Sequence, residues 1–200
     1  MELKLLSFPP VVIPAAALVY GLIHSLTAST GFKHLMYRLL GDWLKKYYRL
    51  FYSIFSVITL LPVITLPILI PDEQLYAIPA PWVYLTGFVQ LASIGLLTYS
   101  MIQTGALQFV GIPQAMGQKP KDELNTGGLY QVVRHPLYTF SLLFLWLTPV
   151  MTRNLALLYG ALTVYILVGA IFEERKLLRI FGQEYAEYRE KTPFIIPYLV

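Results

Sequence analysis

The sequence predicts an all-α integral membrane protein with five transmembrane helices, and three observations support this fold class. Hydrophobic residues make up 56% of the 200 positions and charged residues only 13%, whereas a soluble domain carries about 25% charged residues. The mean hydropathy is correspondingly high, at +0.60. The apolar residues form long runs, and the positive charges cluster in alternate connecting segments. Too few polar side chains therefore remain to cover a water-facing surface.

Five apolar runs are candidates for the transmembrane helices, because a helix of about 20 residues crosses the ~30 Å hydrocarbon core. They cover about residues 8–28, 51–70, 81–102, 137–150 and 155–172. The fourth run is short, and only Met151–Asn154 separate it from the fifth, so we expect these two to form a C-terminal helical hairpin. The first run lacks a basic leader and a small-residue cleavage site, which favours a retained span over a signal peptide.

The positions of the Lys and Arg residues predict the orientation. Thirteen of the fifteen fall on one side of the membrane, in the segments that follow the first, third and fifth runs; Lys4 and Arg153 fall on the other. Cytoplasmic loops are enriched in Lys and Arg, so we expect the N-terminus outside and the C-terminus in the cytoplasm. The net charge of +4 follows from this asymmetry and does not indicate nucleic-acid binding. A compact chain without a targeting signal is typical of a prokaryotic cytoplasmic membrane, with the endoplasmic reticulum as the alternative.

The second half of the chain is where we expect the chemistry. Residues 103–136 connect the third and fourth runs, and a loop of that length in a compact chain is usually functional. We therefore divide the chain into residues 1–103, which carry transmembrane helices one to three, and residues 104–200. The latter form a core made of the cytoplasmic loop, the helical hairpin and a tail helix.

The first group of candidate site residues lies just before the fourth run. Two glycines, Gly127 and Gly128, allow the backbone to turn and to approach a ligand closely. They are followed by aromatic, cationic and imidazole side chains at the membrane edge: Tyr130, Arg134, His135 and Tyr138. The alternative for each residue is a structural one, in which a long Arg side chain and interfacial tyrosines anchor a helix end.

The second group follows the fifth run. Adjacent carboxylates directly after an apolar span, Glu173 and Glu174, are costly unless they are paired or face a polar cavity. On one continuous helix the following apolar and aromatic residues would form a single stripe: Leu177, Phe181, Tyr185 and Tyr188. The alternative is an amphipathic helix on the membrane surface, with a glutamate paired to Arg175 or Lys176. A cationic ligand would explain why the glutamate left without such a partner stands at the end of the span.

Other signals are weaker. His24 is expected to hydrogen-bond between helices, and three scattered histidines without any Cys do not form a zinc site. The absence of Cys also excludes disulfides and a cysteine nucleophile. Gly127-Gly128 lacks the glycine spacing and the Lys-Ser/Thr ending of a phosphate loop. We therefore expect no metal.

The two groups together form a paired pattern. Gly-Leu-Tyr-x-x-x-Arg-His-Pro-x-Tyr, from Gly128 to Tyr138, precedes Glu-Glu-x-x-Leu-x-x-x-Phe-Gly-x-x-Tyr-x-x-Tyr, from Glu173 to Tyr188. This pattern resembles the isoprenylcysteine carboxyl methyltransferase superfamily, which also contains phospholipid methyltransferases, methanethiol S-methyltransferases and NnrU-like proteins. The resemblance extends from about Leu124 to Pro197 and is stronger to the thiol-methylating and NnrU-like branch.

The resemblance implies a methyltransferase that binds S-adenosylmethionine in a cytoplasmic cofactor pocket and needs no metal. It assigns catalytic roles to Arg134 and Glu173, and it assigns cofactor contacts to Glu173 and six further residues: Leu124, Tyr130, His135, Pro136, Leu137 and Tyr138. A sulfonium cation with an adenine ring is bound well by a carboxylate and aromatic faces. Val168-Gly169-Ala170 lacks the Arg that resembles a carboxylate-binding residue in the protein-carboxyl methyltransferases. This favours a thiol or another small or lipophilic acceptor over a prenylcysteine-type carboxylate.

Two other functions remain open from the sequence. Sterol-type membrane reductases have a similar Arg-His-Pro and tyrosine-rich C-terminal pattern but bind NADPH; they have more spans, and no basic pocket for a 2′-phosphate is evident here. A non-enzymatic small membrane subunit is the third possibility, and it predicts that neither cofactor binds.

Overall fold

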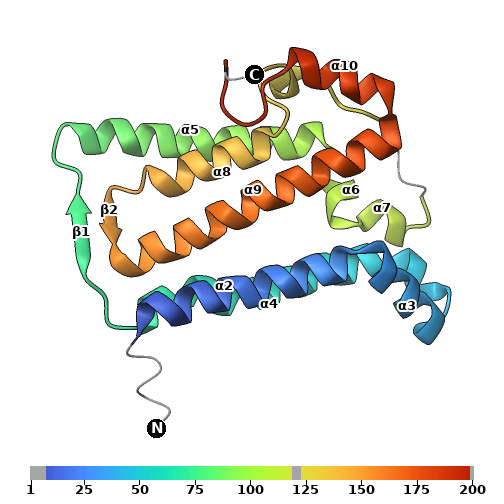
Figure 1. Ribbon diagram of the computed structural model, residues 1–200, viewed down its shortest axis with the longest axis horizontal. Helices are drawn as coiled ribbons and strands as arrows, with labels where there is room; N and C mark the ends of the chain where they lie inside the picture. The colour runs from blue at the N-terminus through green and yellow to red at the C-terminus, as the bar shows by residue number, and fades with distance from the viewer. Residues whose placement is uncertain (1–7, 119–122, 199–200) are drawn as a thin grey trace, which may run out of the picture. The chain divides into compact units, whose positions relative to one another are not determined.

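A computed structural model describes residues 8–118 and 123–198, most of which are helical. Lys4, Lys119 and Lys121, which contribute to the charge asymmetry, lie outside the described residues. The chain divides into two compact units (Figure 1). Unit 1 contains Met1–Leu75, Ala106–Lys121 and Thr152–Leu162, and unit 2 contains Tyr76–Gly105, Asp122–Met151 and Thr163–Val200.

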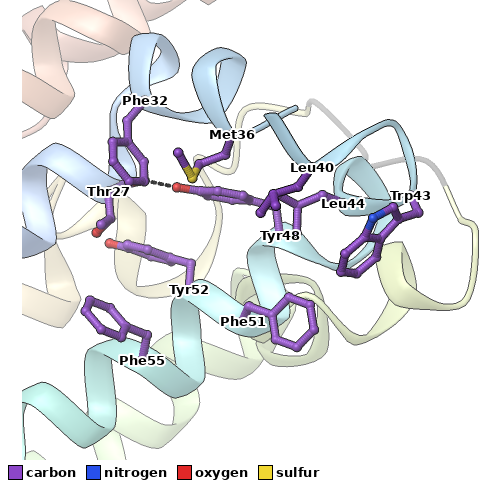
Figure 2. Close-up of a pocket in the computed structure, with 10 residues that line it drawn as sticks. All are labelled: Thr27, Phe32, Met36, Leu40, Trp43, Leu44, Tyr48, Phe51, Tyr52 and Phe55. Atoms are coloured by element: carbon purple, nitrogen blue, oxygen red, sulfur yellow. Dashed lines mark hydrogen bonds between the residues drawn. The ribbon is translucent and has the colours of Figure 1, made fainter. Parts of the chain in front are cut away.

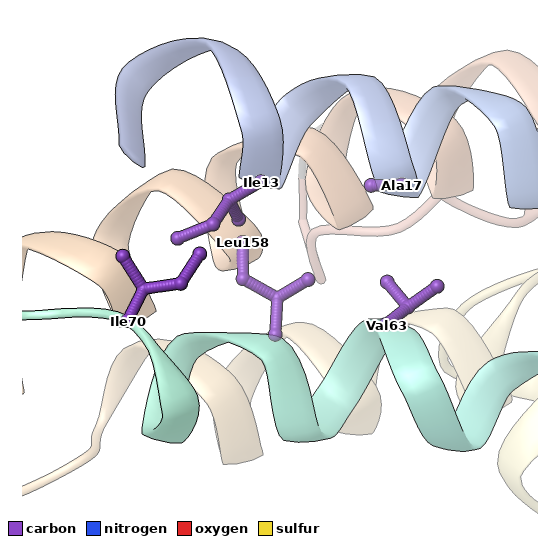
Figure 3. Close-up of a cluster of buried hydrophobic side chains, with 5 residues drawn as sticks. All are labelled: Ile13, Ala17, Val63, Ile70 and Leu158. Carbon is purple, nitrogen blue, oxygen red and sulfur yellow. The ribbon is translucent and has the colours of Figure 1, made fainter. Parts of the chain in front are cut away.

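Unit 1 is built on two long helices that lie side by side, α2 (Pro9–Ala28) and α4 (Trp43–Leu69) (Figure 1). Its other elements are α3 (Thr30–Leu40), α6 (Ala106–Val110), α7 (Ile112–Ala115) and the first part of α9 (Arg153–Phe181). The buried core of this unit is a small cluster of aliphatic side chains, shown in Figure 3: Ile13, Ala17, Val63, Ile70 and Leu158. These residues bring α2, the C-terminal half of α4 and the start of α9 together by apolar burial.

Asn154 fixes the point at which α4 ends. α4 ends at Leu69, so the carbonyls of its last turn lack donors within the helix, and Pro71 has no N–H to offer the carbonyl of Pro67 four residues earlier. The buried Asn154 side chain supplies donors instead, because its Nδ2 lies 3.2 Å from the carbonyl oxygens of both Pro67 and Ile70. The side chain thus satisfies carbonyl groups that a helix end inside a membrane would otherwise leave unpaired.

Acidic residues just after α4 hold the start of α9. The backbone amide of Asn154 donates to Asp72 Oδ1 at 3.0 Å. The neighbouring Glu73 lies 3.4 Å from Arg153 Nη1, and its side chain is 69% exposed while that of Arg153 is 41% exposed. A carboxylate at this position also complements the positive N-terminal end of the helix dipole.

Unit 2 pairs α5 (Trp82–Gln103) with α8 (Pro136–Trp146), which lie side by side in Figure 1. Gln90 Nε2 on α5 donates to the carbonyl of Phe144 on α8 at 2.8 Å. The unit also contains the 3-10 turn η1 (Gly128–Gln131), the second part of α9 and α10 (Gln183–Lys191). The short strands β1 (Gln74–Ala77) and β2 (Val150–Thr152) pair with each other and are an addition to the expected all-helical fold.

Four helices of the described part are long and apolar enough to cross a membrane: α2, α4, α5 and α9. This confirms the expected helical membrane-type fold. The fourth predicted span corresponds to α8, whose 11 residues reach only about 17 Å at ~1.5 Å per residue. The helices α4 and α9 extend beyond their predicted ends, because Lys, Arg and Glu continue a helix readily although they lower its hydropathy.

The expectation of one continuous stripe after the glutamates is wrong. Gly182 adopts a φ of +54° and separates α9, which ends at Phe181, from α10. A positive φ is easily reached by glycine, which lacks a Cβ. Leu177 and Phe181 therefore lie on one helix and Tyr185 and Tyr188 on another, so the chain can turn Tyr185 back toward α9.

Candidate functional site

The centre of the candidate site in unit 2 is the side chain of Glu174, which is only 11% exposed. Arg134 Nε donates to Glu174 Oε1 at 2.9 Å, and Arg134 Nη2 lies 3.3 Å from Oε2. This is the two-pronged geometry that makes guanidinium–carboxylate pairs strong. Because the partner is Arg134, the alternative pairing of this glutamate with Arg175 or Lys176 is wrong.

Two further groups contact the same carboxylate. His135 Nε2 lies 3.0 Å from Glu174 Oε1, and the Tyr185 hydroxyl on α10 donates to that oxygen. Burial first, and then this hydrogen bond, raise the pKa of Tyr185 above its ordinary value of 10.0, so the tyrosine stays protonated and remains a donor. The charge of Glu174 is therefore neutralised and hydrogen-bonded within the protein.

The tail that follows α10 is connected to the start of α8 by hydrogen bonds. Arg134 Nη1 donates to the carbonyls of Arg189 and Thr192. The backbone amide of Arg134 donates to Pro193 at 2.8 Å, and the Thr139 hydroxyl donates to the carbonyl of Ile195 at 2.7 Å. Arg134 thus joins three segments, and its charge is used within the fold.

Glu173 has a different environment from its neighbour. Its side chain is 44% exposed. The Tyr138 hydroxyl donates to Glu173 Oε2 at 2.9 Å, and His135 Nδ1 lies 3.7 Å from the same oxygen. The rings of His135 and Tyr138 stack with centroids 5.3 Å apart. In the described part of the chain, no Lys or Arg comes within ion-pair distance of Glu173.

Tyr130 lies near the same carboxylate. Burial first, and then the negative charge of Glu173, raise the pKa of Tyr130 to about 12, so its hydroxyl is protonated at neutral pH. The Tyr188 hydroxyl on α10 donates to the carbonyl of Tyr130. An aromatic side chain of η1 is thereby held beside the glutamates.

Gly128 allows the loop before Tyr130 to approach the end of α5 closely. Gly128 has a φ of +59°, and a Cβ at this position would lie 1.8 Å from Gln103 Nε2. Gln103 Oε1 accepts from the Leu129 amide at 3.2 Å, and the Gln103 carbonyl accepts from Asn125 Nδ2 at 2.8 Å. Gln103 therefore fixes the loop that carries η1.

The structure brings most of the residues singled out from the sequence into one cluster: Tyr130, Arg134, His135, Pro136, Tyr138 and Glu173. Pro136 starts α8 and is buried, while Leu124 and Leu137 are half-buried. Sequence reasoning missed Glu174 as the centre of the cluster, and it missed the roles of Tyr185 and Gln103. The acidic pair and Tyr185 were visible in the pattern, whereas nothing around Gln103 signalled its role.

No group of three or more His, Asp or Glu side chains suited to a metal occurs in residues 8–118 or 123–198.

The fold and the cluster define a helical membrane protein with a buried Arg–Glu–His centre beside a half-exposed carboxylate. A family model described as phospholipid methyltransferase matches residues 82–184, just over half of the chain. The chain belongs to this family.

Similar proteins include several methanethiol S-methyltransferases. The one from Mycobacterium tuberculosis is 31% identical over 186 residues, which cover 90% of this chain and 75% of that protein. The one from Crocosphaera subtropica is 40% identical over 77 residues, or 38% of this chain and 30% of that protein. A more distant relative is protein-S-isoprenylcysteine O-methyltransferase B from Arabidopsis thaliana, which is 27% identical over 124 residues, or 59% and 61% of the two chains.

The matched part of this chain thus spans less than a third of the Crocosphaera protein. No solved structure matches the chain.

Proposed function

We propose that the chain is a membrane-embedded methyltransferase that uses S-adenosylmethionine to methylate a small or lipophilic acceptor. The observation that carries this proposal is the unequal environment of two adjacent carboxylates. Glu174 is buried and neutralised by Arg134, while Glu173 keeps a 44% exposed side chain beside two stacked rings. Membership in the phospholipid methyltransferase family supports the proposal.

The residues around Glu173 fit the proposed methyl donor chemically. S-adenosylmethionine supplies a methyl group on a sulfonium cation, which an anion and aromatic faces stabilise. In the proposed site Glu173 provides the negative charge and His135 and Tyr138 the stacked rings, while the protonated Tyr130 provides a donor. The remaining lining residues of the cytoplasmic cofactor pocket would be Leu124, Pro136 and Leu137.

Arg134 acts in this proposal as a positioning residue. Its guanidinium is used by Glu174 and by the carbonyls of Arg189 and Thr192. Through Glu174, which also contacts His135 at 3.0 Å, it fixes the ring that stacks on Tyr138. Methyl transfer depends mainly on orientation and on the exclusion of water, so a rigid support of this kind contributes directly.

We propose a thiol as the acceptor. The relatives that match this chain include several named methanethiol S-methyltransferase, and Val168-Gly169-Ala170 offers no cation to bind an acceptor carboxylate. A thiol loses its proton more readily than an alcohol does, and the thiolate is a strong nucleophile, so it needs little help from a general base. A prenylcysteine-type carboxylate is the alternative acceptor.

The proposed arrangement in the membrane has five spans, with α8 as the short fourth one. The N-terminus would be outside and the C-terminus in the cytoplasm, because most Lys and Arg residues lie in segments assigned to that side. Residues 104–200 would form the methyltransferase core, and residues 1–103 the N-terminal transmembrane part. The membrane would be a prokaryotic cytoplasmic membrane.

Calorimetric titration of the detergent-solubilised chain with S-adenosylhomocysteine tests the donor. We expect binding, and we expect Glu173→Gln to weaken it by about tenfold or more, because a charge-assisted contact contributes ~1.5–3 kcal/mol. Tyr138→Phe leaves Glu173 without one hydrogen bond and should weaken binding by about two- to tenfold. Glu73→Gln is the matched control, because it removes an exposed carboxylate from the other acidic pair.

The proposal fails if the folded wild-type chain does not bind S-adenosylhomocysteine, or if NADPH rather than S-adenosylhomocysteine raises its melting temperature. The acceptor is tested separately, by transfer of a labelled methyl group to methanethiol. Transfer to a prenylated cysteine analogue but not to methanethiol would overturn the thiol assignment and leave the donor assignment standing.

A further inference from the structure

Unit 1 contains an open apolar groove that the methyltransferase proposal does not use (Figure 2). It is formed by the end of α2, by α3 and by the first turns of α4, and its volume is about 400 Å³, within the range of ~300–1,000 Å³ that is usual for ligand pockets. Large apolar side chains from two helices line it, among them Phe32, Met36, Trp43, Phe51 and Phe55.

The tyrosine hydroxyls of the groove make hydrogen bonds within the protein. The Tyr48 hydroxyl donates to the carbonyl of Thr27 at 2.6 Å, which is the hydrogen bond drawn in Figure 2. The Tyr52 hydroxyl lies 2.7 Å from His24 Nε2. The rest of the lining is apolar except for the Met36 sulfur and the Trp43 indole nitrogen, so the groove suits a hydrocarbon chain and not a polar ligand.

The groove follows α4 from Trp43 to Phe55, a distance of about 18 Å at ~1.5 Å per residue. Phe51 is 48% exposed and Phe55 43%, on a helix with the hydropathy of a membrane span. Side chains of this kind on such a helix face lipid tails rather than water. An acyl chain lying along these turns would cover them.

Positively charged residues flank the groove on α3 and on the first turns of α4. Five cationic residues lie in positions 30–50, against the single carboxylate of Asp42: Lys33, Arg38, Lys45, Lys46 and Arg49. Lys33 is the most closely connected to the groove, because its Nζ lies 5.9 Å from the centroid of the Tyr48 ring that lines it. α3 itself is an amphipathic helix without any buried residue, as expected for a helix at a membrane surface.

We propose that this groove binds one anionic phospholipid, with an acyl chain along Phe51 and Phe55 and the phosphate headgroup beside Lys33. Apolar length and positive charge occur in the order in which a lipid presents its tail and its headgroup. A zwitterionic lipid would fill the apolar part equally well but would gain less from the cationic end. This inference does not depend on the methyltransferase activity.

A tryptophan placed in the apolar part of the groove makes the proposal directly measurable. The reporter variant combines Phe55→Trp with Trp43→Phe, Trp82→Phe and Trp146→Phe, which removes the three tryptophans of the chain and places a single one beside the proposed acyl chain. In mixed micelles, phosphatidylglycerol with brominated acyl chains should quench this tryptophan saturably, and at lower lipid content than brominated phosphatidylcholine does. The matched control keeps only Trp82, which is the first residue of another membrane-length helix and is 61% exposed. Trp82 should show no preference between the two lipids.

Adding Lys33→Gln to the reporter variant tests the headgroup contact. It should weaken quenching by phosphatidylglycerol about fivefold, the change expected when one cation beside an anionic headgroup is lost, and should leave quenching by phosphatidylcholine unchanged. Lys176→Gln, at an exposed residue of unit 2, should change neither. Equal quenching of the reporter tryptophan by both lipids overturns the proposal, as does an equal loss in Lys176→Gln. It is also overturned if light scattering shows a dimer whose formation protects the reporter tryptophan, because a second copy would then cover the groove.

Discussion

The chain has two pairs of consecutive acidic residues, Asp72-Glu73 in unit 1 and Glu173-Glu174 in unit 2. The two pairs differ in what Glu73 and Glu173 contact. In each pair one carboxylate belongs to the fold, since Asp72 accepts the amide of Asn154 at the start of α9 and Glu174 is bound by Arg134. The other member of the first pair, Glu73, lies 3.4 Å from Arg153. Glu173 instead contacts the hydroxyl of Tyr138 and the ring of His135.

This difference separates a structural cluster from a candidate site. An exposed carboxylate with a cationic partner gains little from binding a further cation, because its charge is already compensated. A half-exposed carboxylate held by a neutral hydroxyl retains its charge for a ligand. The surrounding polar groups are hydrogen-bonded within the protein, which is why the proposed function assigns the ligand to Glu173.

The largest effect should come from Arg134→Ala, which leaves the Glu174 carboxylate buried without its cation. Breaking a buried ion pair from one side costs about 3–5 kcal/mol. For a chain of this size that corresponds to a fall of roughly 6–20 °C in the melting temperature, which can be measured by differential scanning fluorimetry in detergent. Arg134→Lys retains the positive charge, so its melting temperature should fall less.

If Arg134→Ala melted at the wild-type temperature, Glu174 would not depend on its cationic partner. If Glu73→Gln lowered the melting temperature as much as Arg134→Ala does, the two acidic pairs would not differ in their contribution to stability. Glu73→Gln removes a pair exposed to solvent, and such pairs contribute only about 0–1 kcal/mol.

Asn154→Ala addresses the structural cluster of unit 1. The change removes the donors that satisfy the carbonyls of Pro67 and Ile70, and leaving buried carbonyls unpaired costs about 1–3 kcal/mol. We expect a lower melting temperature and an unchanged affinity for S-adenosylhomocysteine when binding is measured well below it. A large loss of affinity with the fold intact would place Asn154 in the functional site and remove the distinction between the clusters.

Gly128→Ala tests how strictly the loop before Tyr130 is positioned. The new Cβ would lie 1.8 Å from Gln103 Nε2 at a φ of +59°. Gln103 must then move and give up its contact with the Leu129 amide, so we expect a loss of about 1–3 kcal/mol in unfolding free energy. Adding Gln103→Ala removes the clash but not the backbone strain. The double variant should therefore be more stable than the sum of the two single changes predicts.

The helices and the residues of the cluster could be predicted because both follow from local pattern. Long apolar runs identified α2, α4, α5 and α9, and the paired motifs brought Arg134, His135 and Glu173 to attention. The different environments of Glu173 and Glu174 could not be predicted from local pattern. It depends on which carboxylate Arg134 reaches from a position 40 residues earlier in the chain, and the sequence does not encode that distance locally.

The break at Gly182 was missed for a related reason. The residues from Leu177 to Tyr188 are compatible with one helix, and a lone glycine is tolerated inside a helix at a cost of about 1 kcal/mol. Only the hydrogen bond from Tyr185 to Glu174 shows what the turn achieves. α3 was missed because its mixed charge and apolar content hides a short amphipathic helix from a search for long hydrophobic runs.

The smallest expected effect is a pH dependence that comes from Asp72. Burial tends to raise the pKa of Asp72, but hydrogen bonds from the Thr152 side chain and from the amides of Asn154 and Glu73 outweigh it and lower the pKa below 3.8. A carboxyl whose pKa is lower in the folded chain stabilises the fold above its unfolded pKa of about 3.9. That contribution is lost as the pH falls through the folded value. Wild type should therefore exceed Asp72→Asn in melting temperature near neutral pH, and the gap should begin to narrow below about pH 4. Because Asp72 is exposed, we expect the gap to be small. A constant gap from neutral pH down to pH 3 would mean that the shape of the side chain, and not its charge, holds the start of α9.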